Sequence, residues 1–223
     1  LGIYFLENGA SVRPSSVVYD RADSAITQAL AEEFDFDTIF EGVDLFHVSG
    51  ITPVLSDTAA ELTMTALKKA KEHGVTVSFD LNYRAKLWTE DVEGKQKMLS
   101  DMMPYVDICF GNARDAAKCL GYTEGDTDFI NGDYSICVDE EHMTNVMKHY
   151  GFTHLITTLR NSISASDNGW SGAICTSSGL YQGSNYNLHI VDRVGGGDSF
   201  ASGVLHGILS DMGAEKALEF GLA

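Results

Sequence analysis

Cations are scarce in this sequence: 15 lysines and arginines stand against 32 aspartates and glutamates, which gives a formal net charge of −17 over 223 residues. Nucleic acids and anionic membrane surfaces attract proteins through clustered Lys and Arg, so we expect neither as a partner. No apolar run approaches the roughly 18 residues that a membrane span needs. Small anionic ligands are not excluded, because a few cations, backbone amides and a metal ion are enough to hold them.

The cysteines lack the spacings that bind metals, since Cys109, Cys119, Cys137 and Cys175 form no C-x-x-C or zinc-type pair. The printed sequence also opens without a signal-peptide pattern. We therefore expect reduced thiols and a cytoplasmic location. The P-loop pattern and a strand-following G-x-G-x-x-G are absent too, so the two commonest phosphate-binding fingerprints do not apply.

Strand-like and helix-like segments alternate from about residue 35 onward, which predicts right-handed βαβ units and an α/β fold with a mostly parallel sheet flanked by helices. The predicted strands are 45–49, 75–80, 106–110 and 153–158, followed by a hairpin of 169–176 and 180–186. The predicted helices are 57–73, 92–102, 112–120, 141–150 and a long one from about residue 196. The acidic stretch 122–139 is predicted to be an irregular surface excursion.

Polar residues follow several of these strands directly, and ligands of such sheets bind beyond the carboxyl ends of the strands. The first candidates for a binding site are therefore Gly50-Ile51-Thr52, Asp80 to Arg84, Gly111-Asn112 and Thr158-Leu159-Arg160.

A run of three glycines, Gly195, Gly196 and Gly197, precedes the last long helix and is followed by Asp198. Consecutive glycine amides at the positive end of a helix dipole can bind an anion. A carboxylate there would repel that anion unless it has a task, and taking a proton from an attacking hydroxyl is such a task. The alternative is a plain loop with Asp198 stabilising the helix terminus.

The segment from Asp192 to Gly203 decides between these readings, because it resembles the carboxy-terminal signature of the ribokinase-like (PfkB) carbohydrate kinases. The usual form in that family is D-T-x-G-A-G-D-x-F, and this sequence departs from it at Arg193 and Gly196. The resemblance implies that Asp198 is the catalytic base and that Gly195, Gly196 and Gly197 form the anion hole. Backbone amides do this work, so glycine in place of alanine keeps the geometry.

Segments 46–53, 77–84 and 159–166 resemble the 2-keto-3-deoxygluconate kinases of that family, and the similarity spans nearly the whole chain. It implies that Tyr4, Tyr19 and Arg21 belong to a β lid over the sugar, and that Ile51 and Arg84 bind the sugar from the core strand ends. Two arginines suit a sugar carboxylate, which a guanidinium can hold with two parallel hydrogen bonds. The alternatives are a surface ion pair for Arg84 and ordinary lid packing for the tyrosines.

The resemblance also implies ATP and Mg²⁺. The family's N-x-x-E pattern, tied to magnesium and its water shell, is matched here by Asn112 and Asp115, a shorter acid that acts through water. Asn112 and Asp115 could equally cap a helix. Asn112, Thr158, Arg160 and Gly197 are the implied nucleotide-binding residues, and Arg160 adds a cation where the family commonly has glycine.

The resemblance further divides the chain into a part of the β lid, 1–25, and an α/β core, 26–223. The sequence begins beside a strand-like run, 2–6, and stops in a helical pattern, 214–222, so we expect an incomplete core that lacks the first strands and the C-terminal helices. Lid strands of this family often pair between subunits, so a homo-oligomer is expected through the lid.

Three alternatives stay open. The chain could be another ribokinase-like sugar kinase of the fructokinase type, which Arg21 and Arg84 argue against. It could be a non-catalytic sugar-acid-binding protein, which Asp198 argues against. It could also be an incomplete and inactive copy.

Overall fold

The computed structural model of the protein describes residues 2–9, 13, 16–21, 23–123, 138–164, 166–192 and 194–223. Most of the predicted surface excursion at 122–139 lies outside these residues, as do Cys137 and Arg193. The other three cysteines, Cys109, Cys119 and Cys175, are buried free thiols, as the sequence predicts.

The described core contains one seven-stranded sheet in the order β3-β4-β5-β6-β7-β8, with β9 also pairing with β7. Strands β3 to β6 are parallel to one another, whereas β7, β8 and β9 add in antiparallel fashion. The strands are β3 Leu45–Ser49, β4 Thr76–Asp80, β5 Ile108–Phe110, β6 His154–Ser162, β7 Asp167–Thr176, β8 Gly179–Gln182 and β9 Tyr186–His189. The predicted α/β fold is confirmed, with a mixed sheet whose parallel half carries the βαβ units.

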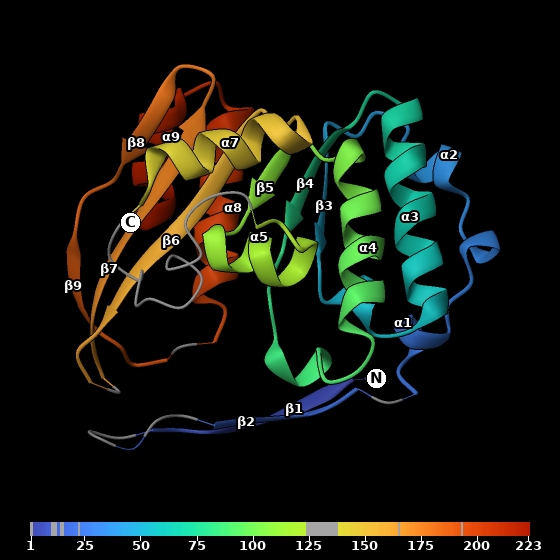
Figure 1. Cartoon of the computed structure of the whole chain (residues 1–223), viewed down its shortest axis with the longest axis horizontal. Helices are drawn as coiled ribbons and strands as arrows, with labels where there is room; N and C mark the ends of the chain where they lie inside the picture. Colours follow the sequence, from blue (N-terminus) through green and yellow to red (C-terminus); the bar gives the residue numbers. More distant parts are fainter. Residues whose placement is uncertain are drawn as a thin grey trace.

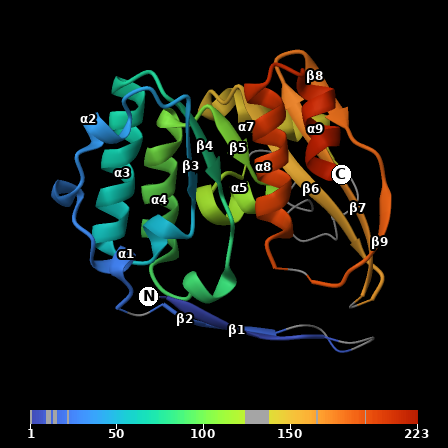
Figure 2. The ribbon, with the colours of Figure 1, turned by 180° about the vertical axis from the view of Figure 1, so that it is seen from behind.

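Helices cover both faces of the sheet (Figures 1 and 2). One face carries α3 Asp57–Glu72, α4 Val92–Met102, α5 Ala113–Leu120 and α7 Glu140–Tyr150, and the other carries α8 Gly196–Leu209 and α9 Ala214–Leu222. Shorter helical turns are α1 Ala25–Gln28, α2 Phe36–Ile39, η1 Ala31–Glu33, η2 Thr52–Val54, η3 Ala85–Leu87 and η4 Met103–Tyr105. Each sheet face therefore buries its own hydrophobic cluster.

The helix boundaries follow local chemistry. Ser56 accepts a hydrogen bond from Ala59 N and starts α3 one residue before Asp57, where the sequence places the helix start. Gly121 and Gly151, both at positive φ, end α5 and α7. None of the helices in the described part of the chain is both long and apolar enough to cross a bilayer.

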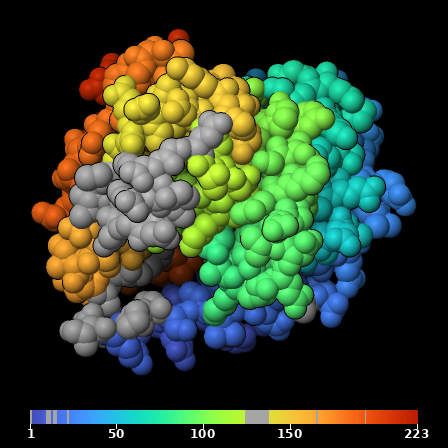
Figure 3. Space-filling model, in the orientation of Figure 1, coloured from blue at the N-terminus to red at the C-terminus, as the bar shows by residue number. Residues whose placement is uncertain are grey.

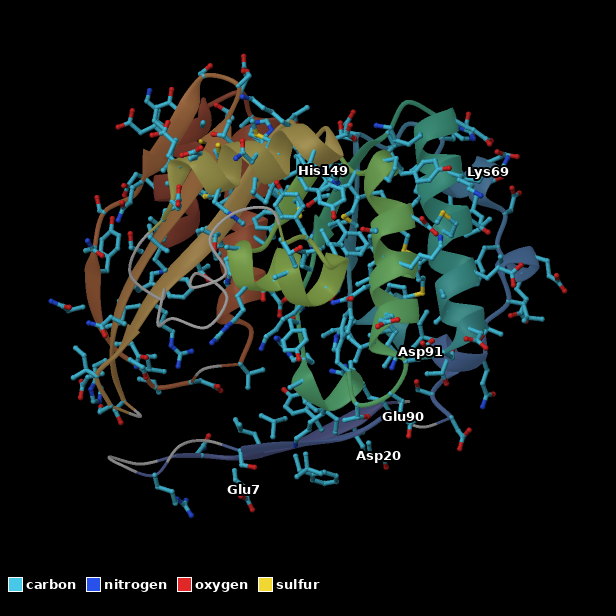
Figure 4. The ribbon with its side chains drawn as sticks, in the orientation of Figure 1. Glu7, Asp20, Lys69, Glu90, Asp91 and His149 are labelled. Carbon is cyan, nitrogen blue, oxygen red and sulfur yellow. The ribbon has the colours of Figure 1, made fainter. Side chains whose placement is uncertain are left out.

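Strands β1 Ile3–Glu7 and β2 Ser16–Asp20 form a separate antiparallel ribbon, the lid, which lies along the carboxyl ends of the core strands (Figures 1 and 3). Tyr4 pairs with Tyr19 and Leu6 with Val17, so these four side chains share the face toward the core. The opposite face carries Glu7, which points away from the core in Figure 4, and the exposed Phe5 and Val18.

Candidate active site

A cavity of about 1340 Å³ lies between the lid and the carboxyl ends of the core strands. Its walls come from the lid, from the loops after β3 and β4, from the end of the β6–β7 hairpin and from the start of α8. The lining residues are Gly2, Ile3, Tyr4, Leu6, Val17, Tyr19, Arg21, Ser24, Ala25, Ile26, Ser49, Ile51, Thr52, Leu55, Asn82, Arg84, Arg160, Ser162, Ile163, Ser164, Val194, Gly195 and Asp198. Its position is where α/β sheets bind ligands.

The charge of this lining is opposite to that of the whole chain. Three arginines, Arg21, Arg84 and Arg160, face the cavity together with one carboxylate, Asp198. The sequence as a whole carries a net charge of −17. The cavity is thus a local cationic region, which suits a ligand with several negative charges.

The glycine run opens α8. Gly195 adopts φ 81°, a left-handed conformation that favours glycine, and its carbonyl accepts the first helical hydrogen bond from Ser199 N at 2.8 Å. The amides of Gly196, Gly197 and Asp198 therefore precede the helical ladder and are available to an anion. A methyl group added at Gly196 would meet no atom within 4 Å, so glycine instead of alanine changes no packing there.

A hydrogen-bond network joins the ends of β3 and β4. Asn82 adopts φ 44° and is held there because its N–H donates to Asp80 Oδ1 at 3.0 Å, while its Nδ2 donates to Ser49 Oγ at 3.1 Å. The same Ser49 hydroxyl accepts from Ile51 N at 3.3 Å. Gly50 is required between them, since a Cβ there would lie 2.6 Å from Leu81 O.

Asp80 is a partly buried carboxylic acid at this junction. The pKa of Asp80 is raised to about 6, mainly by burial and also by the nearby carboxylates of Asp115 and Asp198. The Asn82 backbone hydrogen bond and the charge of Arg84 act in the opposite direction. Near neutral pH, Asp80 is therefore a charge held in an unfavourable environment.

The lid side of the cavity is aromatic. The Tyr4 and Tyr19 rings lie 6.3 Å apart, and the Arg21 guanidinium lies 4.2 Å from the centroid of the Tyr19 ring. Arg21 thus lies against a flat neutral surface, and no carboxylate of the described residues forms an ion pair with it.

Two more arginines approach from the core. Arg84 Nη1 donates to the Tyr83 carbonyl at 3.1 Å, and within the described residues no carboxylate lies within 4.0 Å of the Arg84 guanidinium. Arg160 Nε donates to Asn168 Oδ1 at 3.0 Å across the β6–β7 pair. The structure thus does not support the surface ion pair considered for Arg84.

The predicted metal and nucleotide residues are less closely gathered. Asn112 Oδ1 accepts from Asp115 N at 2.9 Å, and Asp115 Oδ2 accepts from Asn112 N at 3.3 Å, which is a capping box at the start of α5. These two residues, Thr158, Gly196 and Gly197 do not line the cavity as described. Among the residues with described positions, no group of three or more acidic, histidine or cysteine side chains is arranged to hold a metal ion.

The structure adds residues that the sequence argument did not single out. Ser162, Ile163 and Ser164 reach the cavity because β6 extends to Ser162, four residues beyond the predicted strand end. Ser49 stands next to the predicted segment Gly50-Ile51-Thr52, and the strand-end rule alone could have found it. Asn82 lies within the predicted segment Asp80 to Arg84. Arg193, one of the two departures from the family signature, lies outside the described residues.

The site's geometry agrees with a comparison to known families: the model of the pfkB family carbohydrate kinases matches residues 1–223. The chain belongs to this family. A carbohydrate kinase of this family has a clear use for a cationic cavity beside a glycine-rich helix start, because phosphoryl transfer needs positioned donors around a polyanion.

Individual members of this family are similar to the chain over all or most of its length. A 2-dehydro-3-deoxygalactonokinase of Haloferax volcanii is 32% identical over 223 residues, covering 100% of this chain and 62% of the relative. A 2-dehydro-3-deoxygluconokinase of Bacillus subtilis is 28% identical, covering 93% and 56%. The crystal structure of a 2-dehydro-3-deoxygluconokinase from Thermotoga maritima superimposes with a TM-score of 0.88 at 45% identity, covering 100% and 65%. The chain thus spans less than two thirds of the length of these relatives.

Proposed function

We propose that this protein phosphorylates the terminal hydroxyl of 2-keto-3-deoxygluconate (2-dehydro-3-deoxygluconate) with ATP. The observation that carries the proposal is the cavity lining, in which three arginines face one carboxylate beside a free helix terminus. A sugar acid and the ATP phosphates are both anionic, so this local charge suits them together. The names of the similar proteins support the same sugar class.

The lid and the β4 end are assigned to the sugar. Arg21 and Arg84 approach the cavity from opposite walls, and each can hold a carboxylate oxygen. Tyr4 and Tyr19 supply flat surfaces and hydroxyls for the sugar chain, and Ile51 closes the core side. In this assignment, Arg21 and Arg84 bind the carboxylate, which is the group that distinguishes a sugar acid from a neutral sugar.

The start of α8 is assigned to the chemistry. The terminal hydroxyl oxygen attacks the γ-phosphorus, its proton passes to the Asp198 carboxylate, and the bond from phosphorus to the ADP oxygen breaks with its electron pair leaving on ADP. The amides of Gly195, Gly196 and Gly197 stabilise the negative charge on the transferred group. Arg160, with Thr158 and Asn112, is assigned to the nucleotide.

Asp115 and Asn112 are assigned to Mg²⁺ through water. Only one carboxylate oxygen of Asp115 accepts the capping-box hydrogen bond, so the other could accept a hydrogen bond from a metal-bound water. A capping role and a metal role are therefore compatible. Mg²⁺ usually keeps several waters, and it supplies charge neutralisation to the phosphates when bound.

An ADP-release assay tests the function. We expect turnover with 2-keto-3-deoxygluconate at a kcat/KM at least tenfold above that with fructose or ribose. Faster turnover of fructose or ribose would contradict the sugar-acid assignment and favour a fructokinase-type enzyme. Saturable binding of the sugar acid without ADP release would favour a binding protein.

Replacement of Arg84 tests the carboxylate clamp. Arg84→Ala should raise KM for the sugar acid at least tenfold, because a charged hydrogen bond to the carboxylate is lost. KM for fructose, which has no carboxylate, should change less than threefold. Arg13→Ala is the matched control, since Arg13 is an exposed arginine of the lid region that does not line the cavity. An equal effect of Arg84→Ala on both sugars would rule out the clamp.

The cytoplasmic location, the absence of nucleic-acid and membrane partners, and pairing of lids between subunits remain predictions.

A further inference from the structure

Within the described part of a single chain, few contacts hold the lid wall of the cavity in place. An isolated two-stranded ribbon is at best marginally stable in water. Ile3, Phe5 and Val18 of this ribbon are 50%, 59% and 53% exposed, so its apolar side chains gain little from burial. Tyr4 and Tyr19 can contact a sugar together with the core residues only if the separation between the lid and the core wall stays constant.

One side-chain hydrogen bond joins the lid to the core. Lys86 Nζ donates to the Val17 carbonyl of β2 at 2.9 Å, across 69 positions of sequence. Among the described residues, it is the one side-chain hydrogen bond that joins β1 or β2 to the core. Lys86 also has no carboxylate within 4.0 Å in that part of the chain, so its charge is directed at a neutral carbonyl.

The element that carries Lys86 is firmly anchored. Lys86 lies in η3, whose turn is closed by hydrogen bonds from Leu87 N to Arg84 O at 2.8 Å and from Trp88 N to Ala85 O at 3.1 Å. Trp88 is only 8% exposed and belongs to the larger hydrophobic cluster. The lysine therefore reaches the lid from a fixed part of the core.

The same turn sets the position of both cavity walls. Arg84 stands two residues before Lys86 and lines the core wall, while Val17 stands two residues before Tyr19 on the lid face that lines the cavity. The bond from Lys86 thus links the turn after Arg84 directly to the strand that carries Tyr19. We propose that Lys86 is a positioning residue that holds the lid against the core, so that sugar contacts from both walls act on one ligand.

Lys86→Met tests this, because methionine keeps an unbranched stem and removes the donor. We expect KM for 2-keto-3-deoxygluconate to rise about threefold to tenfold, which corresponds to loss of one hydrogen bond. The kcat at saturating sugar and KM for ATP should change less than twofold, because Asp198 and the start of α8 are untouched. Lys86→Arg should restore KM.

Hydrogen exchange read by mass spectrometry gives a measurement that does not need activity. In Lys86→Met, the amides of 3–7 and 16–20 should exchange at least threefold faster than in the wild type, while those of β4 stay unchanged and report an intact core. Lys97→Met is the matched control, since Lys97 is an exposed lysine paired with Asp101 on its own helix, α4, 2.6 Å away.

The expected change in KM rests on the proposed function, whereas the expected change in hydrogen exchange does not. The two measurements therefore test the role of Lys86 and the proposed function separately. Unchanged exchange of the lid amides in Lys86→Met would overturn the role of Lys86, as would a loss of kcat with KM unchanged. If the wild type released no ADP with any sugar, the proposed kinase function would fail, and the exchange result would still decide whether Lys86 holds the lid.

Discussion

Replacing Asp198 with asparagine is expected to lower kcat for the sugar acid by at least a hundredfold while leaving sugar binding nearly unchanged. Asparagine has the same shape and also suits a helix N-terminus, so the start of α8 should keep its geometry. It cannot accept the hydroxyl proton, and general-base catalysis typically contributes about 10²- to 10⁴-fold. ADP release measures kcat, and titration calorimetry with the sugar acid measures binding.

The matched control is Glu215→Gln, which removes the first-turn carboxylate of the neighbouring helix α9 without touching the cavity. Its kcat should equal that of the wild type. If Asp198→Asn retained more than a tenth of wild-type turnover, Asp198 would not be the base. If Asp198→Asn bound the sugar more than tenfold weaker, its carboxylate would have a binding role instead.

Replacing Asp80 with asparagine is expected to stabilise the protein at pH 7.5 by about 2 kcal/mol. The folded-state pKa of Asp80 is about 6 against 3.8 for an ordinary aspartate, a difference of about 2 units. The full shift would be worth about 3 kcal/mol, and the partial exposure of the carboxyl reduces this. Asparagine keeps an oxygen that accepts from Asn82 N, so the turn after β4 is preserved. A rise in Tm of roughly 4 to 8 °C is expected.

The pH dependence gives the sign of this effect. Between about pH 4 and 6 the folded state binds the Asp80 proton more tightly than the unfolded state does, so raising the pH through this window costs wild-type stability. The advantage of the variant should therefore vanish near pH 4 and be complete above about pH 7. Urea unfolding at both pH values measures it.

Asp44→Asn is the control for this experiment, because it makes the same change in net charge at an exposed position. Its stability should differ from that of the wild type by less than about 0.5 kcal/mol at either pH. An Asp80→Asn variant no more stable than Asp44→Asn at pH 7.5 would show that burial of Asp80 carries no cost.

Local patterns predicted much of the fold. The spacing of apolar residues predicted the helices α3, α4, α5 and α7. Their ends were predicted to within one or two residues because capping residues such as Ser56 and Gly121 mark them. The sequence alone predicts that Asp80 to Arg84 belong to the binding site, because the carboxyl ends of parallel strands meet at one edge of the sheet. The family resemblance added the lid residues, which no periodicity indicates.

Contacts between distant parts of the chain could not be predicted in this way. Nothing in the local sequence of Lys86 indicates a bond to Val17, since the bond depends on how the lid is placed. The length of β6 was underestimated because Arg160, Asn161 and Ser162 are polar and exposed, yet they continue the strand by pairing with β7. The raised pKa of Asp80 comes mainly from burial, with smaller contributions from the carboxylates of Asp115 in α5 and Asp198 in α8, which are distant in sequence.

The two walls of the cavity come from separate parts of the fold. The lid supplies Tyr4, Tyr19 and Arg21, and the core supplies Asp198 and the amides of α8. Under the proposed function, substitutions in the short ribbon would change part of the sugar contacts while the residues assigned to phosphoryl transfer stay the same. Such a protein could evolve new sugar contacts through a few substitutions in the lid. A designer could likewise alter these contacts by replacing a ribbon of two five-residue strands.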